Sequence, residues 1–296
     1  MLQVWNLDKQ LSENRTFHLE NISFHIPKGY ICGLIGENGA GKTTLMRALM
    51  GLYQASGKIV INGHDLKQDE AAAKEALGLV FDGGFFQGEM SLEQIGIFYG
   101  QLYYRFEMER YLFYLRQFGL DKKQKYKKLS KGMKTKTQFA FALSHDAKLF
   151  LLDEPTAGLD KHFREDFLRI CAELVSDGER SILISSHITE DLDRIADYIA
   201  YMQDGKLLFS LPKDELCEQF RIASGEDYKC ALIPEEAVVY KEKNPYSTSV
   251  MVANRKRFPM DEALEKHTPD IREFMYYFVK GGKQNAEAVA EKYLKK

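Results

Sequence analysis

Hydrophobic and polar residues alternate over part of the first 30 positions, which is the spacing of extended strands with one buried face. An unbroken apolar run, Tyr30 to Ile35, follows the turn Pro27-Lys28-Gly29 and precedes a helix-like stretch from Leu45 to Leu52. The pattern therefore predicts a β-hairpin that leads into a buried strand, a glycine-rich turn and a helix. The apolar positions of the hairpin are Leu2, Val4, Trp5, Leu19, Ile22, Phe24 and Ile26.

The segment between residues 82 and 145 changes to helical spacing. Ser91 to Gln94 has the residue types of a helix N-cap, and a further helix is predicted over 134–143. These features predict a helical insert of about 83–146. Its apolar positions at helical spacing are Leu92, Ile95, Phe98, Tyr99 and Leu102, then Tyr111, Tyr114, Leu115 and Phe118.

Short apolar runs indicate the remaining strands of the first part of the chain, up to about residue 213. Residues 198–202 and 206–209 flank Asp204-Gly205, which is a signal for a tight hairpin. The other predicted strands are 58–62, 77–81, 148–152 and 181–186.

Residues 214–296 have weaker periodicity and are predicted to form a small accessory α+β region. Alternating segments occur at 230–233, 238–240 and 249–252, and an amphipathic helix is predicted over 271–278.

Composition narrows the class of protein. The chain has 296 residues, 45% of them hydrophobic and 28% charged, with a net charge of −2, which is ordinary for a globular protein and argues against general nucleic-acid binding. The four cysteines have no CxxC spacing, so reduced thiols are expected rather than zinc. No apolar run approaches the roughly 20 residues of a membrane span, and the start lacks signal-peptide features, so any membrane role is expected to come through a partner chain.

The glycine-rich turn has the pattern GxxxxGK[ST] in a strand–turn–helix setting, which predicts a site for a nucleotide polyphosphate. Gly36, Gly39 and Gly41 allow the backbone to approach the phosphates, Lys42 supplies a positive charge, and the Thr43 hydroxyl suits Mg²⁺. The alternative is a glycine-rich turn with a chance lysine. The residues of the predicted site are Gly36, Glu37, Asn38, Gly39, Ala40, Gly41, Lys42, Thr43 and Thr44.

Acidic residues and a histidine follow two of the buried strands. Asp153 would hold Mg²⁺ and Glu154 would act as general base toward water, which is the second half of a P-loop ATPase site. His187 follows the strand 181–186 at its carboxyl end, where ligands bind in open α/β sheets. An acidic pair at a strand end is common by itself, and a lone histidine is usually structural.

A lysine-rich run surrounds Ser130-Lys131-Gly132-Met133-Lys134. Such runs usually form a solvated face. Alternatively, Ser130 and Gly132 at the start of the following helix would present a hydroxyl, N–H groups and the positive end of the helix dipole to a phosphate.

Together these motifs resemble the nucleotide-binding subunit of an ATP-binding cassette (ABC) transporter over residues 1–213. The matching segments are 36–43 (Walker A), 129–133 (signature loop), 149–154 (Walker B), 157–160 (D-loop) and His187 (switch histidine). The resemblance implies an α/β P-loop NTPase core, with a mixed sheet, an antiparallel β subdomain and a helical subdomain. It also implies ATP and Mg²⁺ as cofactors, and Asp160 of the D-loop as a residue of the nucleotide site.

The resemblance implies two kinds of partner. One is a second nucleotide-binding subunit, in a homo- or heterodimer, and the other is a set of separate integral membrane subunits. The chain would then lie in the cytoplasm, peripheral to the inner face of the membrane, with no nucleic-acid partner. The SKGMK form of the signature, with the C-terminal extension, is similar to bacterial ABC-2-type exporter ATPases of the bacitracin-resistance, YtrB and PmtA kind.

Three departures from the family pattern concern the site. The signature carries Lys131 and Met133 but keeps Ser130 and Gly132. Asp82 stands at the position of the Q-loop glutamine, from which it could contact Mg²⁺ or water. The aromatic residue that stacks on adenine is replaced by Leu11, for which Phe17 or Trp5 could substitute.

The signature loop is too far along the chain to close over the P-loop of the same molecule. Two cassettes are therefore expected to enclose two ATP molecules head to tail, each between Lys42 of one and Ser130 of the other. Phe85, Phe86 and Tyr99 are expected near the membrane subunits. Two alternatives are a soluble ABC ATPase that acts on ribosomes or nucleic acid, and a nucleotide-gated clamp that has lost hydrolysis.

Overall fold

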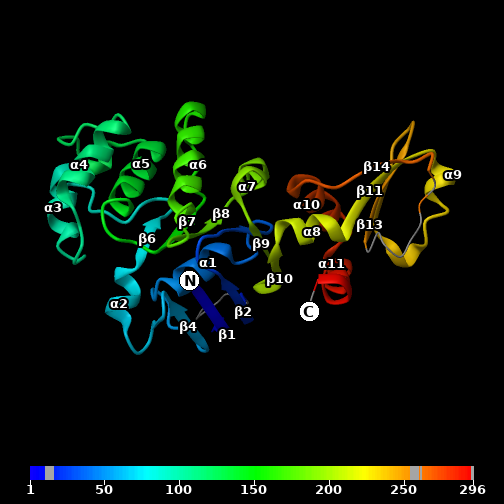
Figure 1. The fold of residues 1–296 in the computed structure, drawn as a ribbon, viewed down its shortest axis with the longest axis horizontal. Coiled ribbons are helices and arrows are strands. Elements are labelled where there is room, and N and C mark those ends of the chain that lie inside the picture. The colour runs from blue at the N-terminus through cyan, green and yellow to red at the C-terminus, as the bar shows by residue number, and fades with distance from the viewer. Residues whose placement is uncertain (11–16, 254–259, 261, 295–296) are drawn as a thin grey trace.

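The computed structural model describes residues 1–10, 17–253, 260 and 262–294. The described residues form three sheets. Figure 1 shows two of them in the middle of the molecule, with a group of helices (α3 to α5) at one end and the third, smaller sheet at the other. None of the helices in the described ranges is long and apolar enough to cross a membrane.

The first sheet is antiparallel and has the strand order β2-β1-β4-β5. Its long hairpin confirms the predicted N-terminal hairpin, and residues of β2 alternate between buried and exposed as the sequence pattern requires. The strands are β1 (Leu2–Gln10), β2 (His18–Ile26), β4 (Lys58–Ile61) and β5 (His64–Asp65).

The central sheet has the order β10-β9-β3-β8-β7-β6, and all its strands except β10 run parallel. Every residue of β3, β7 and β8 is buried, which explains their unbroken apolar runs. Asp204 and Gly205 both have positive φ at the predicted hairpin between β9 and β10. The strands are β3 (Ile31–Ile35), β6 (Leu77–Val80), β7 (Leu149–Asp153), β8 (Ser181–Ser185), β9 (Tyr198–Gln203) and β10 (Lys206–Pro212).

Because these strands are parallel, their carboxyl ends meet at one edge of the sheet, and the helices that follow begin there. The turn after β3 and the ends of β7 and β8 therefore come together. The helices of this core are α1 (Lys42–Leu49), α2 (Glu70–Glu75), α6 (Lys161–Val175) and α7 (Thr189–Ile195).

The predicted helical insert is present, and aromatic side chains such as Tyr111, Phe139 and Phe141 fill its interior. Ser91 and Gln94 form the predicted capping box. The prediction for the last helix was wrong at its start: α5 begins at Lys131, with Ser130 as N-cap, so Gly132 lies inside its first turn. The elements are α3 (Leu92–Gly100), α4 (Met108–Gln117), the short 3₁₀ segment η1 (Tyr126–Lys128) and α5 (Lys131–Ala142).

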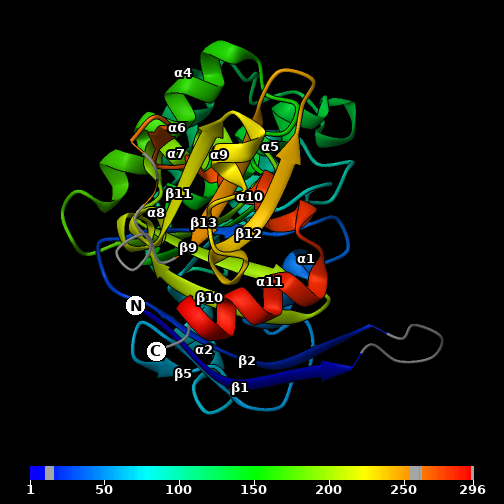
Figure 2. The same cartoon turned by 90° about the vertical axis from the view of Figure 1, so that its right-hand side faces the viewer.

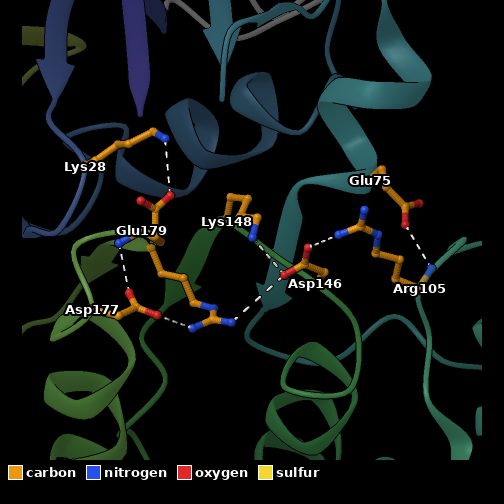
Figure 3. A network of polar contacts seen from close by, with 8 residues as sticks. Lys28, Glu75, Arg105, Asp146, Lys148, Asp177 and Glu179 are labelled. Atoms are coloured by element: carbon orange, nitrogen blue, oxygen red, sulfur yellow. Dashed lines mark hydrogen bonds and ion pairs between the residues drawn. The ribbon is translucent and has the colours of Figure 1, made fainter.

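A network of polar contacts ties this helical unit to the core (Figure 3). The network lies at the amino ends of the parallel strands, opposite the end where the phosphate-binding turn lies. Asp146 accepts from Arg105 Nη1 at 2.7 Å and from Lys148 Nζ at 2.8 Å, and Arg180 lies 4.0 Å from the same carboxylate. Glu75 accepts from the backbone N–H of Tyr104 at 2.9 Å. The loop between α3 and α4 is thus fixed to the segment that precedes β7.

The C-terminal region contains a third, antiparallel sheet with the order β12-β13-β11-β14, which Figure 2 shows from its own end of the molecule. Strands at 238–243 and 248–253 match the alternating segments, whereas the alternation at 230–233 does not form a strand, because Cys230 ends a helix there. The elements are α8 (Lys213–Gln219), β11 (Phe220–Gly225), α9 (Asp227–Cys230), η2 (Glu235–Ala237), β12 (Val238–Lys243), β13 (Thr248–Ala253), β14 (Glu265–His267), α10 (Ile271–Lys280), α11 (Lys283–Val289) and the π-helical η3 (Ala290–Leu294).

Helix α10 joins this region to the core. Phe278 packs edge to face on Tyr201 of β9, with ring centroids 5.1 Å apart, and Phe274 contacts Phe209 of β10. The Asp193 carboxylate, at the end of α7, accepts from the backbone N–H of Ile271 at 2.9 Å. The amphipathic helix predicted at 271–278 therefore buries its apolar face against the edge of the central sheet.

Candidate nucleotide-binding and hydrolysis site

The predicted phosphate-binding turn connects β3 to α1 at the carboxyl edge of the central sheet. Gly41 is the N-cap of α1 with φ of 108°, a backbone conformation that side chains with a Cβ rarely adopt. A Cβ on Gly36 would lie 2.3 Å from the carbonyl oxygen of Met202, so only glycine fits beside β9. The strand–turn–helix setting predicted from the sequence is confirmed.

Lys42 lies over this turn with only 8% of its surface exposed. Its Nζ donates to the carbonyl oxygens of Gly36 at 2.8 Å and of Glu37 at 3.2 Å. Burial lowers the pKa of Lys42, and the nearby carboxylates of Glu154 and Asp153 oppose that shift. The ammonium group is thus held at the phosphate-binding turn, where two neutral carbonyl groups accept its hydrogen bonds.

Asp153 is buried at the end of β7, where two hydroxyl groups donate to it. Thr43 Oγ1 donates to Oδ2 at 2.9 Å, and Ser185 Oγ donates to Oδ1 at 2.6 Å. A hydroxyl and a carboxylate are hard oxygen ligands of the kind that Mg²⁺ prefers when phosphates and water complete its shell. The donor set of Thr43 and Asp153 therefore fits this ion.

Glu154 follows Asp153 with a positive φ of 48°. Its backbone N–H donates to Ser185 Oγ at 3.0 Å, and its side-chain Oε2 lies 2.5 Å from Nδ1 of His187. The backbone N–H of His187 donates to the same oxygen at 3.2 Å. The structure thus brings the predicted base and the predicted switch histidine into direct contact.

A cavity of about 430 Å³ opens beside the phosphate-binding turn, and Glu154 lines it together with Phe17. The other lining residues are Asn38, Gly39, Gly41, Lys42, Thr43 and Thr44. Ser130, Gly132 and Asp160 are not among the described residues that line this cavity, so the signature loop does not contribute to it.

The signature and D-loop residues instead begin two helices. Ser130 caps α5 by accepting from the N–H of Met133 at 3.3 Å. Asp160 caps α6 by accepting from the N–H of Phe163 at 2.9 Å and pairs with Lys136 at 3.2 Å. Two contacts lower the pKa of the Asp160 carboxyl group. The hydrogen bond from the Phe163 N–H has the larger effect, and the hydrogen bond from Lys136 adds to it. A Cβ on Gly132 would lie 2.6 Å from the carbonyl oxygen of Gly158, so the signature loop packs closely on the D-loop.

Asp82 follows β6, and its carboxylate forms an ion pair with Lys131 at 2.7 Å. Its contact with Mg²⁺ stays a prediction. The residue before it is fixed by Gln138, which the sequence analysis missed: Gln138 Oε1 accepts from the N–H of Phe81 at 2.9 Å and Nε2 donates to the Phe81 carbonyl at 3.0 Å. The sequence offered one signal for this contact: Gln138 lies on the apolar side of α5. A buried amide needs polar partners, so its position indicates hydrogen bonds to the backbone of another element.

The candidates for the adenine-stacking residue separate in the structure. Phe17 lines the cavity, and a Cβ on Gly41 would lie 2.6 Å from its Cζ. Trp5 lies on β1 with 43% of its surface exposed and with Lys58 over its ring. Leu11 lies outside the described residues.

A parallel α/β sheet with a phosphate-binding turn, Lys42, and an acidic pair at the next strand end defines a P-loop nucleoside triphosphatase. A family model described as ABC transporter matches residues 19–157. The chain is 30% identical over 225 residues to the bacitracin transport ATP-binding protein BcrA of Enterococcus faecalis, which covers 75% of this chain and 72% of that protein. The chain belongs to the ABC transporter family and is an ATP-binding, ATP-hydrolysing subunit.

Two further similarities agree with this assignment. The ABC transporter ATP-binding protein YtrB of Bacillus subtilis is 29% identical over 221 residues, which are 74% of this chain and 75% of that protein. A dimeric ATP-binding cassette in a post-hydrolysis state, bound to ADP and phosphate, has the same fold with a TM-score of 0.64. It is 20% identical and covers 72% of this chain and 98% of its own.

Proposed function

We propose that this chain pairs head to tail with a second cassette, either another copy or a related subunit, and encloses two ATP molecules. The observation that carries the proposal is the separation of the two halves of the site: Lys42 lines the cavity, whereas Ser130 begins a helix that does not. The start of α5 therefore remains available to the γ-phosphate held by a partner. The dimeric cassette of the same fold supports this arrangement.

Each residue of the site has a proposed role in hydrolysis. Bound Mg²⁺, held by Thr43 and Asp153, would neutralise phosphate charge during the reaction. Lys42 holds the β- and γ-phosphates, and Glu154 accepts a proton from the attacking water. His187 positions Glu154 through the 2.5 Å contact between their side chains. From the same edge of the sheet it senses whether the γ-phosphate is present. Asp160, in the D-loop, is proposed to lie at the interface with the second cassette, where it contributes to the nucleotide site.

Phe17 is proposed to stack on adenine. Phe17→Ala is expected to raise the Kd for ATP by about 5- to 150-fold, because stacking of a base on an aromatic ring contributes roughly 1–3 kcal/mol. Trp5→Ala is the matched control and is expected to bind ATP as the unaltered chain does. Fluorescent-nucleotide titration of both variants measures the effect, and equal losses in the two would exclude a specific role for Phe17.

The membrane subunits are proposed to dock on an exposed apolar face of the helical unit. Ile97, Phe98, Leu102 and Tyr104 are exposed by 56%, 55%, 71% and 94%. Phe86 is 6% exposed and packs against Tyr99, Tyr126 and Phe141, so its ring would support this face from the interior rather than contact the partner directly. Phe85, which is 42% exposed, stays a candidate. Export is the proposed direction, on the resemblance of the signature to ABC-2-type exporters.

Cysteine crosslinking in membranes tests this assembly. Leu102→Cys is expected to crosslink to a polytopic membrane protein, whereas Tyr228→Cys, which is 63% exposed in the C-terminal region, is expected to give none. Such a result would also place the chain at the inner face of the membrane. Cosedimentation with ribosomes in the absence of any membrane crosslink would favour the soluble alternative instead.

A further inference from the structure

Two of the residues that depart from the family pattern contact each other. Asp82 lies after β6 and Lys131 is the first residue of α5, and their charged groups are 2.7 Å apart. The two side chains are 54% and 49% exposed, so both lie at the surface. The pair joins the Q-loop position to the signature loop within one chain.

The position of Asp82 is set by the helix that carries its partner. Gln138, two turns further along α5, makes both backbone hydrogen bonds to Phe81 from the protein interior. The stem of Lys131 passes beside the D-loop, where a Cβ on Gly158 would lie 3.7 Å from its Cγ and Cδ. The carboxylate and the ammonium group are therefore held together next to Ser130, at the end of α5 that faces the proposed partner ATP.

The N-terminal end of α5 carries positive charge. Its first turn contains no acidic residue, and Lys131 adds to the positive end of the helix dipole. The Asp82 carboxylate supplies the opposite charge from another element. An exposed ion pair changes an equilibrium constant only about two- to five-fold, so a phosphate with more negative charge can displace the carboxylate.

We propose that Lys131 is an additional ATP-recognition residue that acts on the γ-phosphate held by the partner, and that Asp82 positions Lys131 in the free chain and releases it when the dimer closes. The inference rests on the proposed head-to-tail dimer. Asp82 thereby competes with ATP for Lys131, and each closing event exchanges an internal ion pair for a contact between subunits.

The test measures Mg-ATP-driven dimerisation by sedimentation of the full chain carrying Glu154→Gln, which keeps ATP intact. Lys131→Gln is expected to raise the Mg-ATP concentration at half-dimerisation about tenfold or more, since hydrogen bonds to charged groups are strong. Asp82→Asn is expected to lower it about two- to five-fold, because the competitor is removed. Lys134→Gln, on the same helix turn, is the control for net charge and is expected to change it less than twofold.

The charge-swapped variant Asp82→Lys with Lys131→Asp separates recognition from structure. It re-forms an ion pair within the chain, so thermal unfolding is expected to match that of the parent, but it places an acid before the phosphate and is expected to abolish dimerisation. Recovery of dimerisation by the swap, or dimerisation of Lys131→Gln at the Mg-ATP concentration of the parent, would show that the pair is only structural. Weaker dimerisation in Asp82→Asn would show that the carboxylate does not compete with ATP, as its predicted contact with Mg²⁺ requires. A parent chain that stays monomeric, alone and in the complex that copurifies with it, would instead overturn the head-to-tail dimer.

Discussion

Glu154→Gln is expected to reduce ATP turnover by about 10²-fold or more while ATP binding is retained. The carboxylate is the only acidic side chain among the described residues that line the nucleotide cavity, and His187 fixes its orientation. An amide of the same size keeps the packing but accepts a proton from water far less readily. Phosphate release at saturating Mg-ATP measures the loss.

The control for this prediction is Glu173→Gln, an exposed acid on α6 that is expected to leave turnover unchanged. A Glu154→Gln protein with near-normal turnover would show that another group takes the proton. The result would also remove the proposed role of His187, because that role depends on the contact between the two side chains.

Lys42→Ala is expected to weaken ATP binding itself. The substitution removes the positive charge that the structure holds over the phosphate-binding turn, and hydrogen bonds to charged groups contribute roughly 1.5–3 kcal/mol, which is about 10- to 150-fold in Kd. Fluorescent-nucleotide titration measures this directly. Lys28→Ala is the control, because Lys28 lies in the turn before β3 and pairs at the surface with Glu179 (Figure 3).

The substitution also affects the turn, because the carbonyl groups of Gly36 and Glu37 lose their donor. Thermal unfolding of the Lys42→Ala protein therefore accompanies the titration. Unchanged ATP affinity in a folded variant would exclude Lys42 from phosphate binding.

Local patterns predicted the parts of the site that lie on single segments. Three short-range signals were sufficient for this: the glycine spacing, the buried strand before Asp153 and the helix after Thr44. The structure brings these segments together at the carboxyl ends of the strands, because the strands are parallel. The capping box at Ser91 and the hairpin at Asp204 follow from neighbouring residues in the same way. The order of these motifs along the chain then identified the resemblance to the ABC transporter family.

Contacts between distant segments could not be predicted in this way. The ion pair of Asp82 with Lys131 and the bonds of Gln138 to Phe81 depend on how α5 packs on β6, which no local pattern specifies. The start of α5 was placed three residues late because its first turn is rich in lysine and contains Gly132, which are poor signals for a helix start. Docking of α10 on β9 likewise depends on a face whose partner lies far along the chain.

The most direct test of the trans arrangement is the mass of the Glu154→Gln protein with and without Mg-ATP. Sedimentation of the purified chain, and of the complex that copurifies with it, is expected to show a cassette dimer that forms with Mg-ATP. Ser130→Ala and Lys42→Ala should each prevent it, and an equimolar mixture of those two variants should recover one complete site per dimer. A cassette that remains monomeric under all of these conditions would contradict the account.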